Sequence, residues 1–379
     1  MAEIDLFERS LAGAFMRLAD DVPGRVDAAA VAHRVALEHP RRRARVPSWG
    51  RVAIPRPAWV LLLVAGLLAA LVGGALLVGS QQRRLRAVVP PAATCPPGST
   101  PDRPGPVDQA RPVGLSDLAF DRRAGRLVAL VGAETWTFDV CTNTWTQMHP
   151  SREPASSGWP QLVYDIDSDV TVGFGFGPDG PSPGRVWAYD LAADTWTQKR
   201  VAPTNAYYTA YDPVSGRVVA VDYHPTALWE YDVETDTWTP IRLAYGPGGY
   251  GPFAHDASVD RMVVYAEEPA GAETWLLDMR TATWSQSTAG TPVVEPSWAG
   301  PAIAYDESAE RTLVMGSAGM AAYDAVADRW EFVAGPGDWY RGTTVYDPVN
   351  GRLVGFGAGA VVAFDLVTRE WTVLLGPTE

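Results

Sequence analysis

Short runs of aromatic and β-branched residues, separated by polar turns, fill the chain from residue 113 to its end. In one stretch they read TAYD (209–212), RVVAV (217–221), LWEYD (228–232) and TWTPI (237–241). Runs of this length and composition, bounded by turn residues, are typical of β-strands. None of them has helical spacing, so the pattern predicts four short strands joined by turns.

This four-strand unit recurs, and an aspartate–tryptophan pair marks every copy. The aspartate ends the third predicted strand, and the tryptophan lies six positions later in the fourth. The pairs are Asp139/Trp145, Asp190/Trp196, Asp232/Trp238, Asp278/Trp284, Asp324/Trp330 and Asp365/Trp371. The tryptophans recur every 41 to 51 residues. A period in that range indicates an array of supersecondary units.

Six units of four strands predict an all-β fold, a six-bladed β-propeller over residues 113–379. One such sheet is too small to bury its own faces, whereas a closed ring buries each face against a neighbour and limits exposed edges. We therefore expect the six repeat tryptophans in the core between blades, where burial stabilises by about 2–3 kcal/mol for each ring.

A second aspartate ends the first strand of each unit, at Asp121, Asp165, Asp212, Asp256, Asp306 and Asp347. Five of these are followed five positions later by an arginine, at Arg126, Arg217, Arg261, Arg311 and Arg352. The aspartates lack the clustered spacing of a calcium-binding loop. We expect them to hydrogen-bond the backbone of their turns and to pair with the arginines across their hairpins.

Third strands carry a further tryptophan in four units, at Trp136, Trp187, Trp229 and Trp275. The fifth and sixth units have Ala321 and Val362 at that position. Smaller side chains are therefore expected at this layer of the last two blades.

The combined pattern, xAYDxxxxRxVxFG followed by WxYDxxTxTW, resembles the Kelch repeat and covers residues 113–379. The paired glycines that usually end the second Kelch strand are here reduced to one, separated or replaced. The resemblance implies a propeller of the galactose-oxidase-like superfamily. Kelch propellers include copper-radical oxidases, so it also requires an enzyme to be considered.

Residues 58–79 form a 22-residue stretch without a charge, long enough to cross a bilayer. A cleaved signal peptide is disfavoured, because 57 residues precede the stretch and its apolar part is too long. Six arginines lie just before it and three just after. This bias predicts a single-pass protein of the plasma membrane, with a cytoplasmic N-terminus and an extracytoplasmic propeller.

Charge divides the chain in the same place. Residues 1–86 hold 13 arginines and 7 acids, a net charge of +6, whereas residues 87–379 hold 18 basic and 37 acidic side chains, a net charge of −19. An exterior this acidic does not favour nucleic acid as a partner. Residues 80–112 are rich in proline and predict a semi-rigid stalk. A single lysine among thirty arginines indicates a GC-rich bacterial genome.

The cytoplasmic segment, residues 1–57, has apolar residues at helical spacing, at Ile4, Phe7, Leu11, Phe15 and Leu18. A second short helix is predicted after Asp27. The layout resembles bacterial single-span anti-sigma factors, which implies a cytoplasmic sigma factor as a partner. The zinc-binding histidine–cysteine signature of many such proteins is absent, and a simple membrane-proximal helix pair is the alternative interpretation.

The two cysteines, Cys95 and Cys141, are both predicted to lie outside the cytoplasm, where disulfides persist. A bridge between them would pin the stalk to the first blade. Two free thiols are the alternative, and the sequence does not show whether the Cα atoms approach within about 7 Å.

Catalytic chemistry is sparse. The propeller holds three histidines, His149, His224 and His255, and His255 replaces the aromatic residue of a first strand, which favours a packing role. We find no nucleophile–histidine pair, no metal-ligand spacing and no phosphate loop, since the glycine-rich residues 173–180 precede a strand. The acidic cluster at 165–169 is the one segment that merits a metal test. The sequence therefore predicts no catalytic residues, metal or cofactor.

Loops between the second and third strands, and between consecutive units, are long and variable, and in a propeller they share one face. Seven aromatic residues precede first strands on that face, at Trp159, Tyr207, Tyr208, Tyr250, Trp298, Trp339 and Tyr340. Aromatic rims suit proteins, peptides or sugars as ligands, although the rings could equally pack the loops onto the blades. The leading hypothesis is a non-enzymatic binding or scaffold module, with anti-sigma signalling and a carbohydrate-active or oxidase enzyme as alternatives.

Overall fold

The computed structural model describes residues 89–115, 117–154, 160–176, 184–203, 205–221, 228–243, 245–249, 251–268, 271–294, 302–335, 343–357 and 359–377. The chain divides into two compact units, Met1–Ala70 and Leu71–Glu379, and all these residues belong to the second. Among them no helix is both long enough and apolar enough to span a bilayer. The predicted membrane stretch 58–79 and the predicted helices of 1–57 lie outside the described residues.

The described residues form six antiparallel sheets, each built from four consecutive strands. Blade one contains β1 (Asp117–Asp121), β2 (Arg126–Val131), β3 (Glu134–Asp139) and β4 (Thr144–Gln147). Blade two contains β5 (Gln161–Asp165), β6 (Val170–Phe176), β7 (Arg185–Asp190) and β8 (Thr195–Gln198). Blade three contains β9 (Tyr208–Asp212), β10 (Arg217–Val221), β11 (Leu228–Asp232) and β12 (Thr237–Ile241).

The second half repeats this arrangement. Blade four contains β13 (Phe253–Asp256), β14 (Arg261–Glu268), β15 (Gly271–Asp278) and β16 (Thr283–Gln286). Blade five contains β17 (Ala302–Asp306), β18 (Arg311–Gly316), β19 (Gly319–Asp324) and β20 (Arg329–Ala334). Blade six contains β21 (Thr343–Asp347), β22 (Arg352–Gly357), β23 (Ala360–Asp365) and β24 (Glu370–Leu375).

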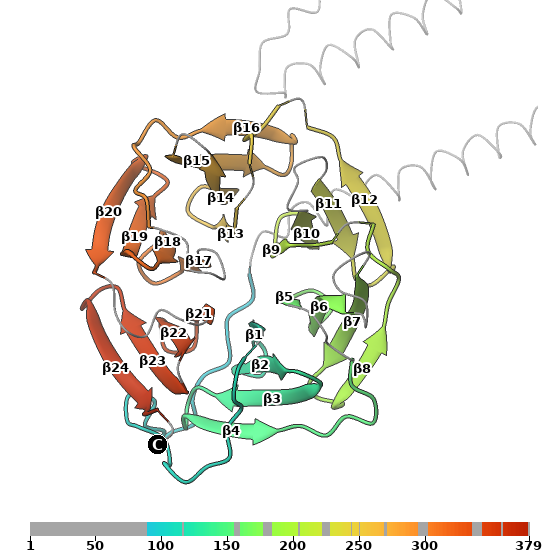
Figure 1. Cartoon of the computed structure of the whole chain (residues 1–379), viewed down its shortest axis with the longest axis vertical. Coiled ribbons are helices and arrows are strands. Elements are labelled where there is room, and N and C mark those ends of the chain that lie inside the picture. Colours follow the sequence, from blue (N-terminus) through green and yellow to red (C-terminus); the bar gives the residue numbers. More distant parts are fainter. Residues whose placement is uncertain are drawn as a thin grey trace, which may run out of the picture. The chain divides into compact units, whose positions relative to one another are not determined.

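The sheets surround a central axis, with the first strand of each blade innermost (Figure 1). Each inner strand contacts the inner strands of both neighbouring blades, and β21 returns to β1. This closed cycle confirms the predicted all-β, six-bladed propeller. One face carries the turns between first and second and between third and fourth strands; we call it the short-turn face. The opposite, long-loop face carries the remaining connections.

The apolar core lies in the seams between adjacent blades rather than within any single sheet. At the seam between blades two and three, for example, Val172 and Phe174 pack with Val218 and Tyr231, all fully buried. Comparable clusters fill the other five seams. Burying both faces of every sheet in this way is what a ring of thin blades requires.

Five of the six repeat tryptophans are buried or half-buried in these seams. The rings of Trp145, Trp196 and Trp284 are buried, and those of Trp238 and Trp330 are half-buried. Trp196 donates its indole N–H to Thr135 of blade one, and Trp330 does so to Thr274 of blade four, both at 2.9 Å. Each indole therefore reaches into the preceding blade.

Trp371 is the exception, because 43% of it is exposed. The prediction that the repeat tryptophans lie in the core between blades is wrong at this position, because the ring lies at the exposed edge of the seam. Blade six has Val362 where blade four has Trp275, the ring that packs against Trp284, so less of the Trp371 ring is covered.

The arginine pairing also differs from the expectation. Four repeat arginines form ion pairs with the aspartate that ends the third strand: Arg126–Asp139 at 3.4 Å, Arg217–Asp232 at 3.6 Å, Arg261–Asp278 at 3.0 Å and Arg311–Asp324 at 2.8 Å. The predicted pairing across the first hairpin is wrong for these four. The first-strand carboxylates are buried and accept hydrogen bonds from their own turns, whereas the third-strand carboxylates are within reach of an arginine that extends toward solvent.

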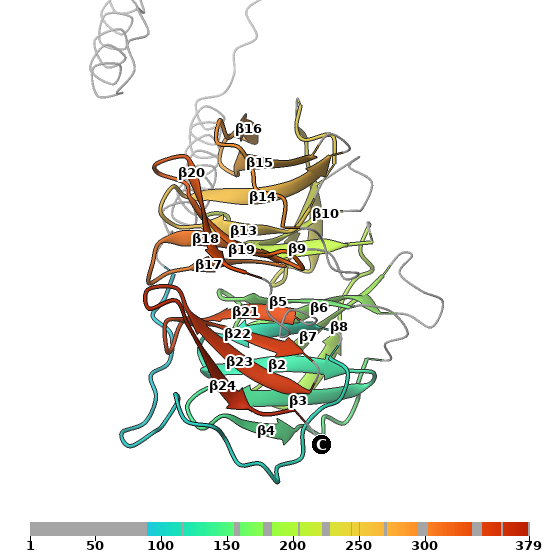
Figure 2. The ribbon, with the colours of Figure 1, turned by 60° about the vertical axis from the view of Figure 1, so that its left-hand side comes forward.

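Residues 89–112, the described part of the predicted stalk and its junction with blade one, lie against the ring; we call them the strap. Ala93 binds the first turn of blade one with its amide (3.0 Å), and Arg111 binds the carbonyl just after β24 (2.6 Å). Between these points, Cys95 forms a disulfide with Cys141 of blade one, with a Cα–Cα distance of 5.4 Å. The strap therefore runs from the short-turn face to the long-loop face around the seam between blades one and six (Figures 1 and 2).

Arg352 fixes the blade-six side of this seam. Unlike the other repeat arginines it is buried, and it pairs with Asp347 at 3.3 Å and with Asp102 of the strap at 3.0 Å. Its guanidinium also donates to the carbonyls of Pro101 and Val140, at 3.2 and 3.4 Å. No strand is shared between blades one and six, so the strap and this arginine join the two ends of the ring.

Removal of the disulfide by Cys95→Ser and Cys141→Ser is expected to lower the free energy of unfolding by about 2–4 kcal/mol, because the unfolded chain regains the freedom of a long loop. Denaturant unfolding of the full-length chain in detergent, with and without reductant, measures this. Reductant should lower the midpoint of the wild type and leave that of the variant unchanged. A reductant-insensitive wild type would contradict the prediction.

Arg352→Ala is expected to cost about 3–5 kcal/mol, because it leaves the buried carboxylate of Asp347 without its cation. Arg311→Ala is the matched control, since Arg311 holds the same position in blade five but its ion pair is partly exposed; it should cost about 0–1 kcal/mol. Unfolding midpoints of the two variants, measured side by side, test the difference. Equal losses would show that Arg352 has no special role at the seam.

Candidate functional site

The two faces of the ring differ in how many of their polar side chains are engaged in hydrogen bonds within the fold. On the short-turn face every repeat aspartate accepts hydrogen bonds from backbone amides of its own turn. Examples are Asp121 with Ala124 N at 2.8 Å and Asp139 with Cys141 N at 2.9 Å. The other ten aspartates make the same local bonds. These carboxylates hold the turns together.

A second group of aspartates on this face binds aromatic residues. Tyr189, Tyr231 and Tyr323 each donate a phenolic hydrogen bond, at 2.6–2.7 Å, to the aspartate five residues later in the turn. Those aspartates, Asp194, Asp236 and Asp328, have positive φ angles of 47–53°. Burial and the adjacent carboxylate raise the pKa of these tyrosines well above the usual range. Short polar side chains tolerate the left-handed conformation. The hydrogen bond from the tyrosine holds each aspartate in that conformation and so stabilises the turn.

The carboxylate of Asp328 is the most heavily hydrogen-bonded of this group. Burial would raise the pKa of Asp328, but hydrogen bonds from Ser287, Thr288 and Tyr323 outweigh this effect and lower it. The carboxylate therefore stays ionised and joins blades four and five.

His255 takes the place of a tyrosine in this scheme. Its Nε2 lies 3.1 Å from Asp260, which also forms an ion pair with Arg280. Burial lowers the pKa of the imidazole, against the influence of Asp212 and Asp256. The side chain thus has a structural partner on the short-turn face and does not point to an open site.

The carboxylates of the acidic segment 165–169 also form hydrogen bonds and an ion pair within the fold. Asp165 is buried and accepts from Ser168 N at 2.9 Å, and burial raises its pKa to about 6. Asp169 accepts from Tyr164 at 2.6 Å and pairs with Arg123 of blade one at 2.9 Å. Within the described part of the chain, no group of three or more histidine, cysteine or acidic residues is placed to hold a metal ion.

The short-turn end of the axis is bridged. Arg122 extends from the first turn of blade one and makes a bidentate contact with Glu307 of blade five, at 2.5 and 2.8 Å. Its Nε donates to Pro90 O of the strap at 2.5 Å. Blades one and five are not neighbours, so this ion pair crosses the short-turn end of the ring.

The sequence predicts seven aromatic residues as ligand-binding residues of the long-loop face. Tyr207 and Tyr208 are described; the other five, Trp159, Tyr250, Trp298, Trp339 and Tyr340, lie outside the described residues. The rings of Tyr207 and Tyr208 meet edge to face, with centroids 5.1 Å apart. Tyr208 packs against the apolar cluster between blades three and four, whereas Tyr207 is 46% exposed.

Local backbone bonds position Tyr207. Its amide donates to Val221 O at 2.8 Å, which extends the pairing of β9 with β10 by one residue. The preceding Ala206 is buried and has a φ of 46°, so the chain turns sharply into the inner strand. Tyr207 thus presents an exposed phenol just before an inner strand, on the long-loop face.

Asp117 is the first residue of β1, as Tyr208 is the first residue of β9, and it was not among the site residues predicted from the sequence. Its carboxylate accepts the amide of Leu162 in β5 at 2.6 Å. Burial raises its pKa to about 7, although the hydrogen bonds from the amides of Leu162 and Leu118 lower it. Asp117 precedes the repeat motif and no spacing rule marks it, so only the approach of β1 to β5 reveals its environment.

The described residues do not supply the ligand set of a copper-radical oxidase. The sulfur of Cys141 is in the disulfide and so cannot be crosslinked to a tyrosine. His255 binds Asp260, and His224 lies outside the described residues.

No family model matches the chain, and no curated protein matches it. Among solved structures, the chain is similar to a structural-genomics protein of unknown function from Bacteroides thetaiotaomicron VPI-5482. The TM-score is 0.46 and the sequence identity 12%, over 74% of this chain and 75% of that one.

Asp117 predicts a pH dependence of stability. Because its pKa in the folded chain, about 7, lies above the ordinary value of 3.8, the folded state holds this proton more tightly than the unfolded state. The resulting stabilisation is complete below about pH 4 and is lost as the pH rises to about 7. Asp117→Asn keeps an oxygen for the Leu162 amide and cannot ionise.

The advantage of this variant in free energy of unfolding is expected to grow between pH 4.5 and pH 8, by up to about 3–4 kcal/mol. Denaturation midpoints at several pH values measure it. Asp108→Asn, at an exposed aspartate of the strap, should show no such trend. An equal effect of Asp117→Asn at both ends of the range would contradict the prediction.

Proposed function

We propose that this chain is a membrane-anchored, extracytoplasmic Kelch-type propeller that binds a protein, peptide or glycan through its long-loop face without catalysing a reaction. The observation that carries the proposal is the difference between the two faces. The repeat carboxylates of the short-turn face are committed to the fold's own hydrogen bonds, and Arg122–Glu307 bridges its centre. Tyr207 presents an exposed ring on the other face.

Two further features support the extracytoplasmic location. The chain has two cysteines, and both are in the Cys95–Cys141 disulfide, a bond that persists in oxidising compartments. The uncharged stretch 58–79, with its excess of preceding arginines, supports a single membrane span with the N-terminus inside. The Kelch assignment rests on the repeat spacing and on the aspartates that cap the first and third turns.

Ligand capture by the full-length chain in nanodiscs, on glycan and peptide arrays, tests the binding function. Tyr207→Ala is expected to weaken capture by about tenfold, because an aromatic anchor near the centre of an interface contributes about 1.4 kcal/mol or more. Phe332→Ala is the matched control, since Phe332 is also an exposed aromatic residue, 60% exposed, but lies on the outer strand of blade five. If both variants bind equally well, Tyr207 is not part of the binding face.

Thiol labelling tests the location. In intact cells a membrane-impermeant maleimide should label Cys95 and Cys141 after mild reduction and not before. Labelling only after cell lysis would place the propeller in the cytoplasm. A pull-down with the full-length chain that captures a sigma factor, and that is lost when residues 1–57 are deleted, would instead favour the signalling alternative.

A further inference from the structure

The strap starts on the short-turn face, close to the axis of the ring. The amide of Ala93 donates to Arg122 O at 3.0 Å, and Pro90 O accepts from the Nε of Arg122 at 2.5 Å. The guanidinium of Arg122 in turn binds Glu307 of blade five across the short-turn end of the ring. Figure 1 shows the first residues of the strap near the centre of the ring. The propeller is therefore joined to the preceding part of the chain at its short-turn face.

The connection to the uncharged stretch 58–79 is short. Residue 89, where the strap begins, follows residue 79 by ten positions, and a chain of that length spans at most about 35 Å. Given the membrane anchoring proposed above, on which the inference rests, the short-turn face is held within this distance of the bilayer surface. A short tether also gives a high effective concentration, so that even a weak contact between this face and the bilayer forms.

Two large apolar side chains project from this face, on the neighbouring blades five and six. Val326 and Val367 hold the same position in the turns between third and fourth strands, and they are 71% and 73% exposed. The other blades have a small, charged or disulfide-bonded residue at this position: Cys141, Ala192, Glu234 and Arg280. The turn itself therefore does not require a valine.

The turn of blade six presents its valine on a backbone whose amides are already hydrogen-bonded. The amides of Val367 and Thr368 donate to the carboxylate of Asp365 at 2.8 and 2.9 Å. The next amide, that of Arg369, donates to Asp365 O at 2.8 Å. Because unpaired amides are costly to remove from water, a turn bonded in this way can enter an apolar environment at little cost.

The two turns are also electrically balanced. Residues 325–328 and 366–369 together hold one acid, Asp328, and one base, Arg369. They therefore carry no net charge, although the propeller as a whole is strongly acidic. What these turns offer to a partner is apolar surface rather than electrostatic attraction.

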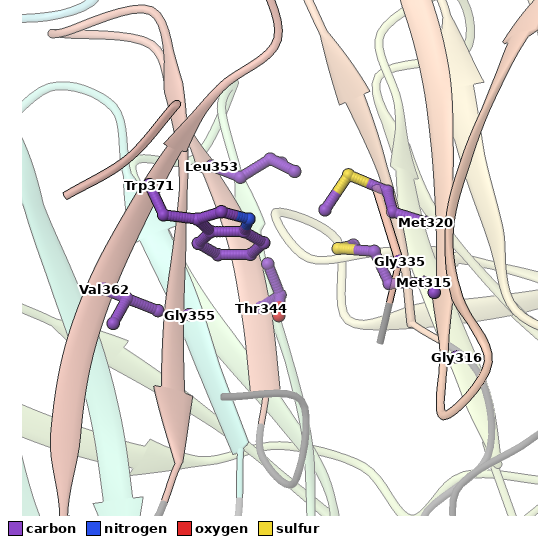
Figure 3. Close-up of a pocket in the computed structure, with 10 residues that line it drawn as sticks. Met315, Gly316, Met320, Gly335, Thr344, Leu353, Gly355, Val362 and Trp371 are labelled. Carbon is purple, nitrogen blue, oxygen red and sulfur yellow. The ribbon is translucent and has the colours of Figure 1, made fainter. Parts of the chain in front are cut away.

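The seam between the same two blades does not offer a competing site. Its pocket is lined by Met315, Met320, Leu353 and Trp371, among others (Figure 3), and has room for only a few water molecules. The exposed valines lie on the surface instead of in a cavity. A surface of this kind suits an extended, deformable partner such as a lipid bilayer.

We propose that the short-turn face of blades five and six rests on the bilayer, with Val326 and Val367 inserted at the boundary between the lipid head groups and the acyl chains. Contacts at this boundary strengthen with the apolar area that they bury. The same contact directs the long-loop face, and with it Tyr207, away from the membrane and toward ligands.

Environment-sensitive fluorophores test the contact in the full-length chain, in nanodiscs of uncharged lipid. Val326→Cys and Val367→Cys each supply one free thiol for labelling, because Cys95 and Cys141 are bonded to each other. Nitroxide groups on the lipids are expected to quench both fluorophores, and a water-soluble quencher should not reach them. Val113→Cys is the matched control, a valine that is 78% exposed where the strap leads into β1 on the long-loop face. Its fluorophore should respond to the water-soluble quencher alone.

A charge at the proposed depth tests the insertion itself. Val326→Glu, added to the Val367→Cys reporter, should lower quenching by the lipid nitroxides to the level of the Val113 reporter, because a carboxylate is costly to remove from water. Ala192→Glu makes the same change at the corresponding position of blade two, on the opposite side of the ring, and should leave quenching unchanged. High salt should also leave it unchanged. Equal effects of the two glutamates, or a loss of quenching in high salt, would overturn the proposal.

The outcomes separate this contact from the anchoring on which it rests. A chain that does not remain with the nanodisc would overturn both. An anchored chain whose fluorophores at positions 326 and 367 behave like the one at 113 would overturn the bilayer contact alone. Protection from the water-soluble quencher without quenching by the lipid nitroxides would identify a protein neighbour, such as a second copy of this chain, and would also overturn it.

Discussion

Each blade of this protein has two apolar faces and cannot bury either of them alone. Burial of one sheet face against the next blade is therefore the interaction on which the whole structure depends. It explains why the core is divided among six seams and why the largest buried rings, such as Tyr189 and Tyr231, lie in them. It also means that the ring is stable only when it is closed, because one open seam would expose the faces of two blades.

The seam between blades six and one needs more than packing, because the chain does not pass directly from one of these blades to the other. Every described sheet is built from consecutive strands, so no strand joins the two blades across this seam. The strap takes that role by combining a covalent link to blade one at Cys141 with polar contacts to blade six at Arg352. In blade five the repeat arginine, Arg311, makes a partly exposed ion pair, whereas in blade six Arg352 is buried and connects the blade to the strap.

Departures from the repeat identify the parts of the ring that are available for function. Where all blades agree, as in the turn aspartates, the side chains serve the fold. Where they differ, the ring has local features that its own stability does not require: the exposed phenol of Tyr207, the protonatable Asp117 between β1 and β5, and the apolar pocket beside Trp371. The binding function proposed above uses one of these irregular positions, Tyr207.

The sequence by itself determined the number of blades, the four strands in each and the turns that the aspartates cap. These features depend on contacts within a few residues, such as Asp139 with the amide of Cys141, so fixed spacing is enough to reveal them. Only the tertiary structure decided how Arg352 pairs, that the strap lies on the ring, and that Trp371 is exposed. Each of these depends on surfaces that are distant in sequence and meet only when the ring closes, and on the size of the side chain that the neighbouring blade presents.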